Sequence, residues 1–87
     1  MPQSSMLVTF AHLPPEKLAR VAEGLTHEIA KLAPNEGVSA LFYPVPGQNS
    51  LRARIEALRF ADMEKMSDRV EELLTRLGGE ISERVMT

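Results

Sequence analysis

Hydrophobic and polar residues follow one another along this chain in patterns that predict alternating strands and helices. A run from Met6 to Leu13, rich in apolar, β-branched and aromatic residues, predicts a first strand that ends before two prolines. The second of these, Pro15, suits the first position of a helix, because no backbone donor is needed there. This helix is predicted by apolar residues at steps of three and four, which are Leu18, Val21, Ala22, Leu25, Ile29 and Leu32. We expect residues Ala33 to Gly37 to end it.

Two further strands follow in the middle of the chain. Residues Val38 to Val45 form the second predicted strand, and Pro44 within it indicates the edge of a sheet, because proline cannot donate a backbone hydrogen bond. A turn leads to the third predicted strand, from Leu51 to Phe60. Over most of this strand, apolar residues alternate with charged ones, which is typical of a strand with one face in water.

A second helix and a short strand complete the pattern. Asp62 is a suitable helix cap, and the apolar positions that follow it are Met63, Met66, Val70, Leu73, Leu74 and Leu77. Gly78 and Gly79 are expected to end the helix, because glycine adopts the left-handed conformation that closes a last turn. The remaining residues, Glu80 to Thr87, alternate weakly through Ile81 and Val85 and are interpreted as a fourth strand.

The predicted order is therefore βαββαβ, within a single domain of residues 1–87. Right-handed crossovers between strands would place both helices on one face of the sheet. We accordingly predict the α+β fold class, as a two-layer sandwich of a four-stranded sheet and two helices.

The sheet face away from the helices is expected to hold several large apolar side chains. Neither alternating set of the first strand is polar, and the second strand adds Leu41 and Tyr43. We also expect Leu58 and Phe60 to share the face of the third strand that carries Arg54. Burying one such side chain is worth roughly 1.5–3 kcal/mol. We therefore predict a closed, symmetric homo-oligomer formed through this face, with a monomer of mildly apolar surface as the alternative.

Composition excludes several classes of function. The chain has 10 basic and 12 acidic residues, a net charge of −2, which argues against a nucleic-acid-binding protein that relies on positive charge. The absence of cysteine excludes disulfides and thiolate metal sites. No apolar run is long enough for a membrane span and no signal-peptide pattern is present, so we expect no membrane association and a cytoplasmic location. His12 and His27 lack the spacing of metal ligands, and we expect neither a metal nor a cofactor.

Three arginines and one aromatic residue are the candidates for ligand binding. Arg52, Arg54 and Arg59 give the third predicted strand a basic row, and a guanidinium group binds carboxylate or phosphate in a two-pronged manner. Tyr43 is a candidate for lining a pocket with Arg54 and Arg59. The alternative is a solvated or intersubunit face on which Glu56, and Glu80 or Glu83, neutralise the arginines.

Pro2 is the candidate catalytic residue. Removal of Met1 would leave a secondary amine at the N-terminus, and an apolar strand beside it would lower the pKa of that amine toward neutrality. Such an amine can act as a general base next to a carbonyl group. The alternative is a proline that only follows the initiator methionine.

The pattern from Pro2 to Val45 resembles the tautomerase superfamily, whose members combine β-α-β units with a catalytic N-terminal proline. The resemblance lies in Pro2, the strand Met6–Leu13, the helix start Pro15-Glu16-Lys17 and the strand VSALFYPVP. The segment RARIEALRFADMEKMSDRVEELLTRLGG is similar to a second unit without the proline. The resemblance implies that Pro2 is a base and Arg59 a carboxylate anchor, in an enzyme acting on a small keto or enol acid.

A ferredoxin-like sheet, including the dimeric barrels that enclose small substrates, is the competing arrangement. Its second strand pairs with the third as a hairpin, whereas in a tautomerase it pairs in parallel with the first. The short link from Pro44 to Ser50 favours the hairpin. We therefore expect a small intracellular homo-oligomeric domain that binds a small ligand or a protein partner, with the tautomerase-like enzyme as the alternative.

Overall fold

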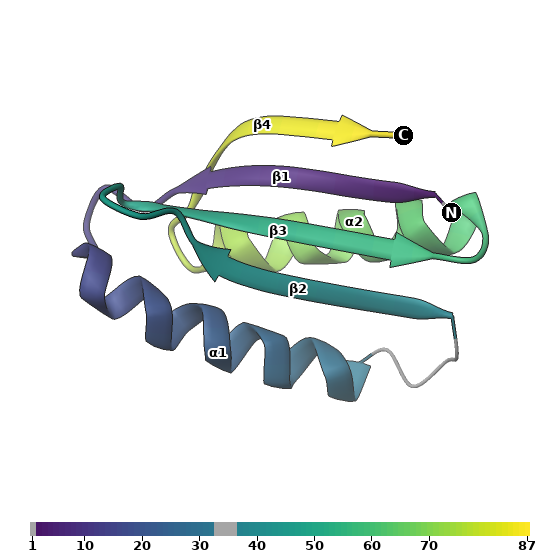
Figure 1. The fold of residues 1–87 in the computed structure, drawn as a ribbon, viewed down its shortest axis with the longest axis horizontal. Helices are drawn as coiled ribbons and strands as arrows, with labels where there is room; N and C mark the ends of the chain where they lie inside the picture. Colours follow the sequence, from purple (N-terminus) through teal and green to yellow (C-terminus); the bar gives the residue numbers. More distant parts are fainter. Residues whose placement is uncertain (1, 33–36) are drawn as a thin grey trace.

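The computed structural model of the chain describes residues 2–32 and 37–87, which form one four-stranded sheet and two helices (Figure 1). The elements are β1 (Gln3–Thr9), α1 (Pro15–Leu32), β2 (Val38–Pro44), β3 (Ser50–Ala57), α2 (Phe60–Arg76) and β4 (Glu80–Met86). The predicted βαββαβ order and α+β class are thereby confirmed. The expected end of the first helix at residues 33–36 lies outside the described residues.

The strands pair in the order β2-β3-β1-β4, and every pair is antiparallel. The second and third strands form a hairpin, and the first strand lies between the third and the fourth (Figure 1). This is the pairing expected of a ferredoxin-like sheet. Pro44 lies on the edge strand β2, as its missing backbone donor predicts.

Both helices pack on one face of the sheet (Figure 1). Because side chains alternate between the faces of a strand, Met6 and Val8 are fully buried while their neighbour Leu7 is only partly so. The helices bury Leu18, Ala22, Leu25, Ile29, Met63, Val70 and Leu74 against the same face. None of the described helices is long and apolar enough to cross a membrane.

The bounds of two strands, β1 and β3, differ from the prediction. The strand β1 begins at Gln3 and ends at Thr9, although Phe10 beyond its end is still fully buried. The strand β3 ends at Ala57, so the expectation that Leu58 and Phe60 share the sheet face of Arg54 is wrong. Leu58 instead donates its backbone N–H to the carbonyl of Gly37 at 2.9 Å, where the chain leaves the sheet.

The start of the second helix also differs from the prediction. Arg59, in an extended conformation, is the residue before the first helical turn, and no side chain caps that turn. Asp62 lies within the turn and accepts a hydrogen bond of 2.8 Å from Nε of Arg59. A carboxylate in the first turn is still favourable, because it faces the positive end of the helix dipole.

The glycine pair after α2 acts as the sequence predicts. Gly78 has a φ of 92°, which is the left-handed conformation that ends a helix at low cost for glycine. Gly79 is needed for a different reason, because the chain passes close to the core there. A methyl group at this position would lie 2.5 Å from Cγ1 of Val8 and 2.9 Å from Cζ of Phe10.

We predict that Gly79→Ala lowers the free energy of unfolding by about 1–3 kcal/mol, the usual cost of overpacking a core. The matched control is Gly24→Ala, at an exposed position of α1 where the added methyl group would meet nothing within 4 Å beyond the adjoining backbone of its own helix. That variant should be more stable than the parent by about 0.5–1 kcal/mol, because alanine favours the helix. Urea unfolding measures both, and equal effects would contradict the close contact at Gly79.

Candidate functional site

The strand register places the residues of the sheet face opposite the helices. We call this face the open face. Cross-strand pairing aligns two rows on it, Tyr43–Arg52–Leu7–Glu83 and Leu41–Arg54–Ser5–Val85. The first row joins Tyr43 of β2 and Glu83 of β4 to Arg52, whereas the second joins the apolar Leu41 and Val85 of the two edge strands to Arg54.

A hollow of about 350 Å³ lies on this face. Its lining includes Gln3, Ser5, Tyr43, Arg52, Arg54 and Val85. The side chains contributed by the sheet are thus two guanidinium groups, a phenol, an amide, a hydroxyl and an apolar wall. This combination can bind a small molecule that has a negative end and an apolar end.

The two arginines of the hollow are held by neutral oxygen atoms of β1. Nη1 of Arg52 donates to Oγ of Ser5 at 2.9 Å, and Nη2 of Arg54 donates to Oε1 of Gln3 at 3.1 Å. Their carboxylate neighbours are farther away, with Glu83 at 3.6 Å from Arg52 and Glu56 at 3.7 Å from Arg54. Glu56 and Glu83, which were expected to neutralise these arginines, are therefore nearby, but neither carboxylate is within hydrogen-bond distance of them.

The binding residues predicted from the sequence do not all line the hollow. Tyr43 and Arg54 line the hollow together, because the β2–β3 hairpin places them in adjacent rows. Arg59 does not reach it, since its side chain is 80% exposed beyond the end of β3 and is paired with Asp62. Arg52 joins the site through the alternation along β3, which is visible in the sequence.

Pro2 lies at the start of β1, outside the lining of the hollow. Its carbonyl accepts a hydrogen bond of 3.1 Å from the backbone N–H of Ala57, so it is fixed beside the end of β3. Met1 lies outside the described residues. The catalytic role of the Pro2 amine stays a prediction.

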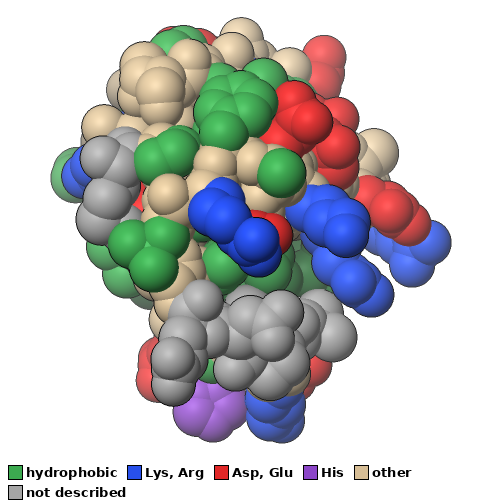
Figure 2. Space-filling view, turned by 90° about the vertical axis from the view of Figure 1, so that its right-hand side faces the viewer, with side chains coloured by type: hydrophobic (Ala, Val, Ile, Leu, Met, Phe, Trp, Pro, Cys, Tyr) green, Lys and Arg blue, Asp and Glu red, His purple; other side chains and the backbone are tan. Residues whose placement is uncertain are grey.

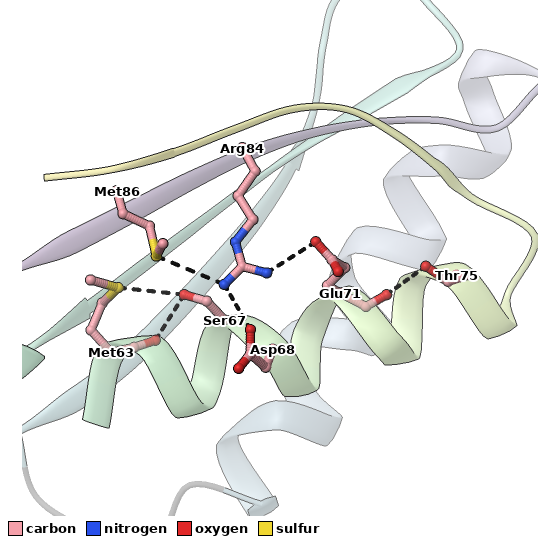
Figure 3. Close-up of polar contacts among 7 residues, drawn as sticks. All are labelled: Met63, Ser67, Asp68, Glu71, Thr75, Arg84 and Met86. Carbon is pink, nitrogen blue, oxygen red and sulfur yellow. Dashed lines mark hydrogen bonds and ion pairs between the residues drawn. The ribbon is translucent and has the colours of Figure 1, made fainter. Parts of the chain in front are cut away.

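Arg84 is a second charged centre, which the sequence analysis missed (Figure 3). It reaches from β4 to α2, where Nη2 donates to Asp68 at 2.8 Å and Nη1 donates to Glu71 at 3.0 Å. The hydrogen bond to Asp68 is the main reason that the pKa of Arg84 is raised, although partial burial acts in the opposite direction. Arg84 therefore stays charged and ties the edge strand to the helix.

A β-bulge explains why this contact is hidden in the sequence. The register between β1 and β4 shifts between Leu7 and Val8, so that Val8 pairs with Ile81 while Ser5 pairs with Val85. Without the shift, Ile81 and Val85 would share one face, as their spacing suggests. With it, Ile81 packs against the core, Val85 joins the open face and Arg84 points toward α2.

Neither histidine belongs to a metal site among the residues that the structure describes, which contain no group of three potential ligands. The ring of His12 lies against that of Phe10, with 6.3 Å between the centroids.

Comparisons of the chain with protein-family models, curated proteins and solved structures give no match.

We predict that Arg84→Met lowers the free energy of unfolding by about 1–3 kcal/mol, because it removes two charge-assisted hydrogen bonds from a side chain that is 21% exposed. The matched control is Arg76→Met, which removes the exposed pair with Glu72 within α2 and should cost at most about 0.5 kcal/mol. Guanidinium chloride unfolding measures the difference. A similar loss in the two variants would contradict the anchoring role of Arg84.

Proposed function

We propose that this protein is a small intracellular, self-associating domain. In this proposal its open face pairs with the same face of a second copy, and a small ligand binds in the space between the two sheets. The observation that carries the proposal is the uncovered sheet. Two helices cover one face, and among the described residues no element covers the other.

Large apolar side chains are exposed on the open face. Leu41 is 54% exposed, Val85 47% and Tyr43 39%, and all three belong to the edge strands. The other exposed large apolar residues of the described chain lie away from the open face. They are Leu58, Phe60 and Leu77, at or near the ends of α2, and Met86, on the helix side of β4. Removing apolar area from water yields roughly 25 cal/mol per Å², which favours a flat partner that covers both edges of the sheet.

The charges of the open face suit a second copy of the same surface. Arg52 and Arg54 lie beside Glu56 and Glu83, and Glu80 pairs with Thr9 on the same face, so this face carries side chains of both signs. In a two-fold interface each patch meets itself, and a patch of mixed sign can place arginines of one copy against carboxylates of the other. The end of the molecule where β1 begins and β3 ends shows the same mixture of hydrophobic, basic and acidic side chains (Figure 2).

We predict that Leu41→Lys shifts the protein toward a monomer, because it replaces the most exposed apolar side chain of the open face with a charge. The control is Leu77→Lys, which adds the same charge at an exposed apolar residue that follows α2. Sedimentation velocity over a range of concentrations measures the mass against the 9.7 kDa of one chain. We expect about a tenfold weaker self-association for Leu41→Lys, equivalent to about 1.4 kcal/mol, and no change for the control.

The same measurement on the unmodified protein tests the proposal directly. A species of 9.7 kDa at every concentration would contradict self-association. Equal weakening by both lysine variants would show that copies associate through a surface other than the open face.

A further inference from the structure

We infer that the hollow on the open face binds a small monocarboxylate with an apolar body, such as an aryl-substituted acid. The carboxylate would lie between Arg52 and Arg54, and the apolar body would lie against Val85 and the ring of Tyr43. This inference rests on the proposed function, because the second copy supplies the other wall of the site.

The first support is the contrast between the arginines of the hollow and the other paired arginines. Outside the hollow, Arg59, Arg76 and Arg84 each hold a carboxylate oxygen at 2.6 to 3.0 Å. Inside it, the nearest carboxylates among the described residues are at 3.6 and 3.7 Å. The chain thus makes close ion pairs at these three arginines, whereas the two guanidinium groups that face the hollow have no carboxylate oxygen within hydrogen-bond distance among the described residues.

Because Arg52 is partly buried, its long distance to the nearest carboxylate matters for ligand binding. The side chain of Arg52 is only 28% exposed, close to the 21% of Arg84, which has two carboxylate partners. A guanidinium group that has lost much of its water gains more from an anion than one in open solvent, because the local dielectric constant is lower. Its planar fork also matches the two oxygens of a carboxylate.

The neighbouring charges favour a single negative charge on the ligand. Glu56 and Glu83 do not line the hollow, but they lie next to the arginines and would repel a dianion such as phosphate. Val85 of β4 and the ring of Tyr43 of β2, from the two edges of the sheet, offer contact to a hydrocarbon body. A volume of about 350 Å³ is at the lower end of the range for small-molecule pockets, so the ligand is small.

The test is a titration with phenylacetate, followed by backbone amide shifts in NMR spectra of the full chain. We expect saturable shifts at residues of β1 and β3 that line the hollow, and at least about tenfold weaker binding of the neutral phenylacetamide, since the charge-assisted hydrogen bonds are lost. Arg54→Gln should weaken phenylacetate binding by a similar factor. Arg59→Gln is the matched control, because this exposed arginine lies outside the hollow, and binding should not change.

The possible results separate this inference from the proposed function. Equal binding of phenylacetate and phenylacetamide, or equal loss in the two arginine variants, would overturn the carboxylate site. Sedimentation of the same samples reports self-association independently. A dimer that gives no saturable shifts would overturn the ligand inference and leave self-association standing, whereas a 9.7 kDa monomer that gives saturable shifts would overturn the dimer and with it the second wall of the site. The comparison of the two ligands uses the unmodified protein, so it does not depend on the folding of a variant.

Discussion

The structure depends on one constraint, which is that two helices can cover only one face of a four-stranded sheet. Side chains of a strand alternate between the two faces, so each strand must supply both a set for the core and a set for the opposite side. The core set is apolar and fully buried on β3, where Leu51, Ala53 and Ile55 contact the helices. The other set lies on the face of the sheet that the two helices leave uncovered.

The bulge between Leu7 and Val8 links the stability of the fold to the composition of this surface. A single shift in register turns Arg84 toward Asp68 and Glu71, and it turns Val85 to the open face. The ion pairs hold the edge strand β4 against α2, which keeps the exposed strand in place. The same local irregularity therefore anchors one wall of the hollow and supplies its apolar side chain.

The sequence predicted the helices and the order of the elements because apolar periodicity over 17 or 18 residues is a strong signal. It failed at the start of β1, where Gln3, Ser4 and Ser5 are polar. Pairing makes them a strand, since Gln3 exchanges two backbone hydrogen bonds with Thr87 and lies opposite Glu56. Polar residues in such a segment give no local signal, because their partners come from distant parts of the chain.

The candidate site, too, could be predicted where it depends on a local sequence pattern and not where it depends on pairing between distant strands. The alternation along β3 places Arg52 and Arg54 on one face, and the short turn after Pro44 brings Tyr43 beside them. Arg59 is out of step with this alternation, since it has the parity of the buried residues Leu51, Ala53 and Ile55, and the chain leaves the sheet after Ala57, so that the residue lies before α2. The contribution of Gln3 and Ser5 depends on the β1–β3 register, which no local pattern specifies.

Self-association and ligand binding would reinforce one another on this face. Covering the open face removes water from Arg52, whose close hydrogen bond is to the neutral hydroxyl of Ser5. A guanidinium group buried further without a tightly held anion carries a larger desolvation cost. A bound carboxylate offsets that cost, and the second sheet strengthens the attraction between carboxylate and guanidinium by lowering the local dielectric constant. Because such coupling is reciprocal, a ligand that binds more tightly between two sheets must stabilise the dimer by the same free energy.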